Sequence, residues 1–193
     1  GVGSAGTTAV EGAADTSLIG RQNHAAMTDT NIDEKTGGKN SALTVSATNS
    51  GNSYNTALVI AVSGTASVGA AVAVDNDSSD ADALISGGTL NVGNLSLAAL
   101  SQNDIMTIGA GGAASTATGI AGSVGVNVLT GNTTAKVDNG AKITADKHVM
   151  IAAQSDDAVN DLVGLVQAGG AGVSAGVSVG VNTIAGSTEA LVD

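Results

Sequence analysis

The chain has 193 residues with 28 glycines and one aromatic residue, and it contains no proline, cysteine, tryptophan or phenylalanine. Its 17 acidic and 6 basic residues give a formal net charge of −11. That charge repels phosphate backbones, so nucleic acid is excluded as an expected partner, and the absence of cysteine excludes disulfides and thiolate metal sites. Because aromatic side chains fill most ordinary cores, we expect an interior of small and β-branched side chains instead, without a roomy pocket.

Short strand-like runs recur along the chain, separated by Gly turns and polar clusters. In chain order the expected strands are 31–33, 43–47, 83–85, 87–92, 95–99, 136–138, 140–145, 149–153 and 191–193. The strands that begin at Leu43, Leu95 and Val149 align with one another, and a polar cluster follows each of them (49–55, 101–104 and 155–161). Interior glycines disfavour helix, so the chain is expected to be almost entirely β.

A three-residue phrase, Ser-Val-Gly, marks the repeat. It begins at Ser67, Ser123 and Ser178. A period of this size, about 55 residues, indicates stacked copies of one supersecondary unit. We divide the single repeat segment 1–193 into part-copies at about 1–66, 67–122, 123–177 and 178–193. Because the repeat runs to both ends, we expect a piece of a longer protein.

Strict alternation over 171–183 places β-branched side chains on one face and Gly, Ser and Asn on the other. Another sheet is therefore expected to approach closely on the glycine face. The uncharged windows 105–135 and 162–188 exceed the roughly 20 residues of a membrane helix. Their period of two and their Gly, Ser and Thr content favour β-structure, and no transmembrane helix is expected.

Each unit of the repeat divides into three strand-turn-strand passages of roughly 18 residues. That length suits one coil of a parallel β-solenoid, which predicts roughly three coils per unit. Ten or so coils at about 4.8 Å per layer would make a rod about 50 Å long.

The segments 87–99 and 139–153 carry a resemblance to a known family. In each, a Gly turn leads into two short alternating strands that end in small residues. They resemble the coil motif of filamentous haemagglutinin-like exoproteins, and 121–128 is similar to stretches of very large bacterial adhesins, including the leukotoxin-like adhesins of fusobacteria. The resemblance covers most of the chain from about residue 37. It implies an all-β, right-handed parallel β-helix, export through an outer-membrane partner or barrel, and a role as shaft or display surface.

The densest acidic cluster contains Asp75, Asp77, Asp80 and Asp82. Alternating carboxylates on a loop could supply oxygen ligands to Ca²⁺, so these four residues are the candidate metal site. The cluster lacks the Gly at the sixth position and the Glu at the twelfth that an EF-hand loop needs, and it does not recur in the next unit. A solvated acidic turn is the favoured interpretation, and no other cofactor is expected.

Catalytic motifs are not evident. His24 and His148 lie far apart in the sequence, and the Gly-rich run 109–112 is followed by no Lys-Ser/Thr, so it is not a phosphate loop. A polysaccharide-active β-helix enzyme would need clustered charges and aromatic sugar platforms. With Arg21 the only arginine and Tyr54 the only aromatic residue, the chain is not expected to be an enzyme.

The function that these patterns favour is a structural and adhesive shaft segment of a secreted or cell-surface bacterial exoprotein. Its expected partner is an unidentified receptor or glycan on host or neighbouring bacterial cells. Two alternatives remain open. One is the polysaccharide-active enzyme, and the other is a matrix or fibre protein that self-associates end to end.

Overall fold

The computed structural model describes residues 2–34, 41–169 and 172–193. These residues form an all-β structure, as the composition predicts. Its strands are β1 (Val2–Ala5), β2 (Thr8–Thr28), β3 (Asn31–Asp33), β4 (Ala42–Ser63), β5 (Ala66–Ser86), β6 (Thr89–Ser115), β7 (Thr118–Asp138), β8 (Lys142–Gly169) and β9 (Val173–Val192).

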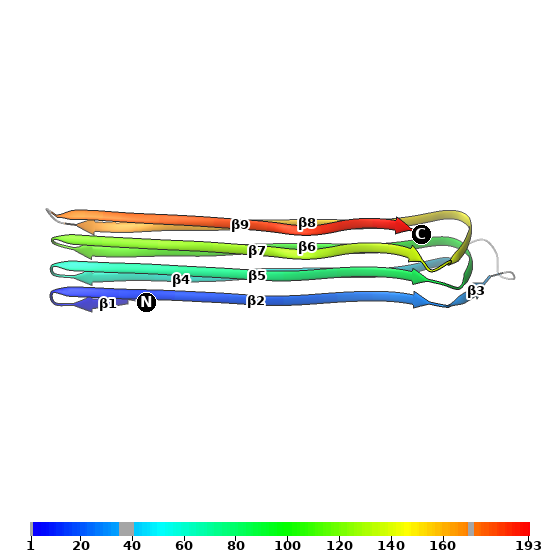
Figure 1. The fold of residues 1–193 in the computed structure, drawn as a ribbon, viewed down its shortest axis with the longest axis horizontal. Coiled ribbons are helices and arrows are strands. Elements are labelled where there is room, and N and C mark those ends of the chain that lie inside the picture. The colour runs from blue at the N-terminus through cyan, green and yellow to red at the C-terminus, as the bar shows by residue number, and fades with distance from the viewer. Residues whose placement is uncertain (1, 35–40, 170–171) are drawn as a thin grey trace.

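The strands form two parallel sheets that face each other (Figure 1). Sheet A has the order β1-β4-β6, with β3 and β8 also pairing with β6, and sheet B has the order β2-β5-β7-β9. The chain alternates between the sheets, so one long strand of each makes one coil. The predicted parallel β-solenoid is confirmed, whereas its right-handedness stays a prediction.

The number of coils per repeat was wrong in the sequence-based prediction. Neighbouring strands of sheet B pair Thr8 with Ala66, Ala66 with Thr118, and Thr118 with Val173, so one repeat is one coil and not three. The polar clusters are not turns, because they continue inside β4, β6 and β8 and point alternate side chains between the sheets. The long dimension therefore runs along the strands, and the 27 residues of β6 span about 90 Å.

The register agrees with part of the predicted alignment. Leu43 pairs with Leu95, and Leu95 with Val149, as the sequence alignment of these strands predicts. The second and third Ser-Val-Gly phrases also pair residue for residue. The first phrase does not, because Ser67 pairs with Gly119. The sequence also suggests that 31–33 and 83–85 occupy equivalent places in the repeat, but 31–33 pairs with 89–91.

The predicted Gly turns close the coils at one end of the molecule. Gly87, Gly88 and Gly140 have φ values of 67°, 76° and 69°, in the left-handed region that suits glycine. At Gly88 a Cβ atom would also lie 2.2 Å from the Thr30 carbonyl oxygen. Next to these turns lies the apolar core, whose largest buried side chains are Ile85, Leu90, Leu95, Leu97 and Val137.

The opposite end of the molecule, which we call the glycine zone, is thin. It comprises 57–63 of β4, 108–115 of β6 and 162–169 of β8, together with 66–74 of β5, 118–126 of β7 and 173–181 of β9. A Cβ on Gly69 would lie 2.1 Å from the Gly112 carbonyl oxygen, and one on Gly111 would lie 2.2 Å from that of Gly122. The two backbones are therefore in contact at these positions. On 173–183, where the close approach was expected, a Cβ on Gly176 or Gly180 would instead lie 2.6 Å from a side chain of β8, Leu165 or Asp161. Ala171 lies outside the described residues.

The β-branched side chains of the glycine zone point outward. On β9, Val177, Val179 and Val181 are 66%, 43% and 45% exposed. The described residues of the two uncharged windows lie mainly at the end of β6 and in most of β7, and at the end of β8 and in most of β9. In the described part of the chain, no helix is long and apolar enough to cross a membrane.

Candidate functional site

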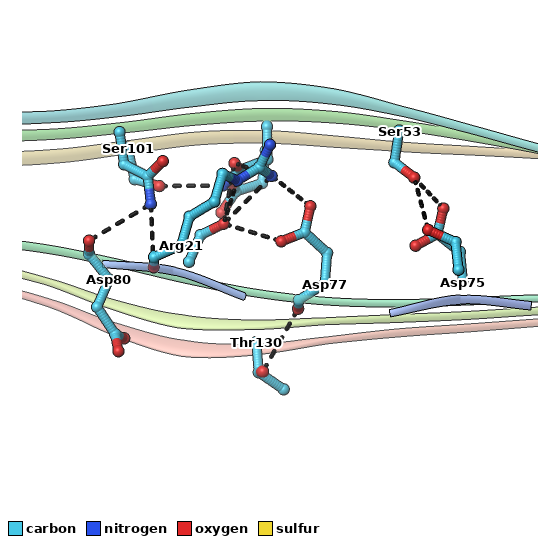
Figure 2. Close-up of polar contacts among 12 residues, drawn as sticks. Arg21, Ser53, Asp75, Asp77, Asp80, Ser101 and Thr130 are labelled. Carbon is cyan, nitrogen blue, oxygen red and sulfur yellow. Dashed lines mark hydrogen bonds and ion pairs between the residues drawn. The ribbon is translucent and has the colours of Figure 1, made fainter. Parts of the chain in front are cut away.

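A polar zone fills the interior between the apolar core and the glycine zone. Figure 2 shows several of its side chains between the strands of the two sheets. Its side chains come from alternate positions of β4, β5, β6 and β7 and are at most 4% exposed. They are Asn49, Ser53, Asn55, Asp75, Asp77, Ser79, Ser101, Asn103, Thr107, Asn127 and Thr133. Buried polar groups cost free energy unless they are hydrogen-bonded, so the partners of these groups decide what the zone does.

Arg21 of β2 is at the centre of the best-connected part of this zone. Its guanidinium forms an ion pair with Asp77, whose side chain is 1% exposed. It also donates to Ser79 Oγ at 3.3 Å and to Asn103 Oδ1 at 3.0 Å. A Cβ on Gly51 would lie 1.3 Å from an Arg21 nitrogen. The missing side chain of Gly51 thus makes the room that the guanidinium fills.

The network continues from Asn103 into the next coil. The Asn103 amide donates to Ser101 Oγ at 3.0 Å and to Asp157 Oδ1 at 2.8 Å. Ser155 donates in turn to Asp157 Oδ2 at 2.6 Å. Three successive coils are therefore joined by side-chain hydrogen bonds in addition to the backbone ladders.

A second polar group lies closer to the glycine zone. Ser53 donates to the Asp75 carboxylate, and Thr107 to Asn127, which donates to Asn182 Oδ1 at 2.7 Å. This group is less complete than the Arg21 network. Its buried oxygens without a hydrogen-bond partner are Asn55 Oδ1, Asp75 Oδ1 and both carboxylate oxygens of Asp161.

The four carboxylates of the candidate Ca²⁺ site lie on a strand, not on a loop. Asp75 and Asp77 point between the sheets and are 0% and 1% exposed. Asp80 and Asp82 point outward from the same strand, where Asp80 accepts from the backbone nitrogen of Asn132 at 2.9 Å. The alternation of the strand separates the two pairs. Within the described residues, no group of three or more His, Cys, Asp or Glu residues could hold a metal ion.

The remaining candidate residues are also dispersed. His24 on β2 and His148 on β8 are both exposed, on strands of different sheets. Arg21 is inside the molecule, whereas Tyr54 is 69% exposed on the outer face of sheet A. The charges and the aromatic ring that a sugar-cleaving groove would need are therefore on different surfaces.

Asp161 gives a testable pH dependence. Burial raises the pKa of its carboxyl above the usual value. The carboxylate occupies the space left by two glycines, since a Cβ on Gly125 would lie 2.4 Å from Asp161 Oδ1 and one on Gly180 would lie 2.6 Å from Asp161 Oδ2. Because the folded state holds the Asp161 proton more tightly than the unfolded chain does, the ionised carboxylate lowers stability above this raised pKa. The penalty disappears as the pH falls through it.

We therefore expect Asp161→Thr to be more stable than the wild type at pH 7. Threonine occupies the paired position 107 of the neighbouring strand, where it bonds to Asn127. Each kcal/mol regained is worth about 2–4 °C in the melting temperature of a chain this size. The difference between variant and wild type, measured by thermal unfolding, should shrink towards pH 4. An equal difference at both pH values would contradict the assignment.

Sequence reasoning missed Arg21, Ser79 and Asn103 as partners, because long stretches of chain separate them. The available signal was the repeat itself. One repeat apart along the chain, Arg21 aligns with Ser79 and Gly51 with Asn103. Aligning the strands at these spacings would have placed all four residues in the interior between the two sheets.

The polar zone can hold the register of neighbouring coils, and its carboxylates are already engaged by donors of the same chain or enclosed by backbone. Comparisons with protein-family models, curated proteins and solved structures gave no match for this chain. The function of the chain is therefore inferred from its geometry.

Proposed function

We propose that this chain is a scaffold segment of a secreted or cell-surface bacterial exoprotein, and that the exoprotein attaches its cell to host or neighbouring cells. The resemblance of 87–99 and 139–153 to filamentous haemagglutinin-like coils supports this class. The structure supports a refinement of the role from shaft to display surface.

The observation that carries this refinement is the length of the strands. One coil uses about 55 residues and advances the stack by a single strand spacing of about 4.8 Å. A solenoid with shorter coils, each a third of this length, would advance about three times as far with the same residues. What the long coil provides instead is area, because each layer presents two outer faces, and β6 alone is 27 residues long. The geometry favours a broad plate over a reaching rod.

The outer faces beside the Gly turns are the part suited to a polar partner. Small hydroxyl and amide side chains form rows across neighbouring strands there, such as Thr44 beside Ser96 and Asn132 beside Ser187. In the second row the two side chains are 2.9 Å apart. Hydroxyl groups repeated at the strand spacing can bond a glycan or an extended peptide at several points.

Attachment can be tested with the purified segment immobilised on beads. We expect these beads to bind epithelial or bacterial cells more than albumin-coated beads do. The triple variant Thr44→Ala, Ser96→Ala and Ser187→Ala should lose at least half of that binding while its melting temperature is unchanged. Binding no higher than to albumin, on every cell type tried, would contradict the proposal.

A further inference from the structure

Where the polar zone meets the glycine zone, its side chains face one another across the two sheets. Thr107 of β6 donates to Asn127 of β7. In the preceding coil, the positions paired with these two residues are Asn55 of β4 and Asp75 of β5. Asn55 and Asp75, which we call the facing pair, therefore oppose each other as Thr107 and Asn127 do. Figure 2 shows Asp75 pointing between the sheets towards Ser53, which shares the inner face of β4 with Asn55.

The facing pair has more hydrogen-bond acceptors than donors. Asp75 is 0% exposed, and its Oδ2 accepts from Ser53, but its Oδ1 has no hydrogen-bond partner. Asn55 is 1% exposed, and its Nδ2 donates to the Val74 carbonyl oxygen, whereas its Oδ1 has no partner either. Turning the Asn55 amide over does not relieve this, because its oxygen would then lie against the Val74 carbonyl. The interior therefore encloses two opposed oxygen atoms without a donor.

The negative charge of Asp75 is also uncompensated. Asp77 on the same strand is equally buried, and it is Asp77 that forms the ion pair with Arg21. Arg21 is the only arginine of the chain, and among the described residues no ion pair includes Asp75. Two buried carboxylates and one guanidinium leave a charge of −1 in the interior. A buried carboxylate is costly unless it is paired or coordinates a metal ion.

The atoms around this charge are those that a hard cation takes as ligands. Besides the two enclosed oxygens, the site has the hydroxyl groups of Ser53 and Ser17. Ser53 bonds to Asp75, and Ser17 Oγ is 3.5 Å from Ser53 Oγ, at the position of β2 that pairs with Asp75. Carboxylate and amide oxygens suit hard cations. With a single carboxylate, a monovalent cation makes the site neutral, whereas a divalent one leaves a buried positive charge.

The carboxylate of Asp161, whose oxygens also have no hydrogen-bond partner, lacks such a set of ligands. Asp161 and Asn182 occupy the equivalent positions in the following coil. The Asn182 oxygen is already used, because it accepts from Asn127 at 2.7 Å. The Asp161 oxygens lie instead in the space left by Gly125 and Gly180. Only the facing pair combines a buried carboxylate with a second enclosed oxygen opposite to it.

We propose that the facing pair binds a monovalent metal cation, Na⁺ or K⁺, between Asn55 Oδ1 and Asp75 Oδ1. The bound cation neutralises Asp75 and joins a strand of sheet A to a strand of sheet B within one coil. A bridging water molecule would satisfy both oxygens but would leave the charge of Asp75 uncompensated. The proposal goes beyond the attachment function and does not depend on it. It also differs from the acidic cluster considered for Ca²⁺, because Asp80 and Asp82 point outward.

Thermal unfolding in different chloride salts of equal ionic strength tests the proposal. A cation that binds only the folded state raises the melting temperature. At about 150 mM salt, we expect the wild type to melt at least about 4 °C higher in NaCl or KCl than in tetramethylammonium chloride. The methyl groups of tetramethylammonium keep its charge away from oxygen ligands, so it serves as the inert salt. The nuclear magnetic resonance line of sodium should also broaden when the protein is added.

The neighbouring coil supplies a variant that should fold without the cation. Asn55→Thr combined with Asp75→Asn reproduces the pair of Thr107 and Asn127, which bond to each other directly. This double variant should melt at the same temperature in all three salts and leave the sodium line narrow. Asp80→Asn is the matched control, because it removes an outward carboxylate of the same strand. It should keep the salt dependence of the wild type.

Three results would overturn the proposal. Equal melting temperatures of the wild type in all three salts would assign the enclosed oxygens to a bound water or a proton. A salt dependence that persists in the double variant would place the cation elsewhere. A larger rise in CaCl₂ of the same ionic strength, lost in the double variant, would contradict a monovalent ion. The bead assay with the double variant separates this proposal from the attachment function, because attachment should persist in that variant.

Discussion

Replacing Arg21 with alanine is expected to lower the free energy of unfolding by about 3 kcal/mol or more. The substitution leaves the buried Asp77 carboxylate without its cation, and removing one partner of a buried pair costs about 3–5 kcal/mol. It also empties the space beside Gly51 that the guanidinium fills. Denaturant unfolding followed by circular dichroism measures the change.

The neighbouring residue provides the control for this prediction. Gln22 is on the same strand but contacts Asp80 on the exposed face, at 3.3 Å, so Gln22→Ala should stay within about 0.5 kcal/mol of the wild type. A second substitution should restore the lost stability. The neighbouring strands carry apolar residues, Ile19 and Leu129, at the positions paired with Asp77, so an apolar side chain suits this place in the interior. Arg21→Ala combined with Asp77→Leu should recover much of the loss. A loss as large in Gln22→Ala as in Arg21→Ala would refute the role of the ion pair.

Substituting Gly111 with alanine is expected to cost about 3 kcal/mol, the upper end for overpacking a core. The new methyl group would lie 2.2 Å from the Gly122 carbonyl oxygen of the opposite sheet. Backbone cannot move aside as a flexible side chain can, so the two sheets must separate locally. Chemical denaturation gives the free energy, and hydrogen exchange should show the loss confined to the glycine zone.

Gly109 is the matched control for Gly111. It is two residues away on β6 and also faces inward, but its Cβ would lie 3.4 Å from the nearest atom, the Val124 carbonyl oxygen. Gly109→Ala is expected to lie within about 1 kcal/mol of the wild type, since the lower entropy of the unfolded chain offsets a slight crowding. Equal costs at the two positions would show that the sheets are not in contact at Gly111.

The fold class could be predicted from the sequence because both the repeat of about 55 residues and the alternation of side-chain types along each strand are visible in it. The alignment of Leu43, Leu95 and Val149 and the turns at Gly87 and Gly140 were correct for the same reason. The coil length was not predictable from local pattern. The segment from Asn49 to Asn55 has the composition of a turn. It is stable as a buried strand only because side chains of the opposite sheet, such as Asp75, form hydrogen bonds with it.

The polar zone was harder to predict than the fold. The acidic cluster of β5 was identified, but as a solvated turn, because a run of carboxylates is usually exposed. Strand alternation divides it, so Asp77 meets Arg21 in the interior while Asp80 remains outside. That outcome depends on the register between coils, which one arginine and a few glycines help to set. No local sequence motif predicts that register.

One repeat makes one coil of two long strands, and a single distance tests this arrangement most directly. Since the chain has no cysteine, spin labels can be placed through Thr44→Cys and Val62→Cys, both at outward positions of β4. Continuous strand joins these positions, so pulsed electron paramagnetic resonance should give about 60 Å. In a solenoid with three coils per repeat the same positions would be neighbours on adjacent layers, and the labels would lie within about 20 Å of each other. A distance that short would contradict the account.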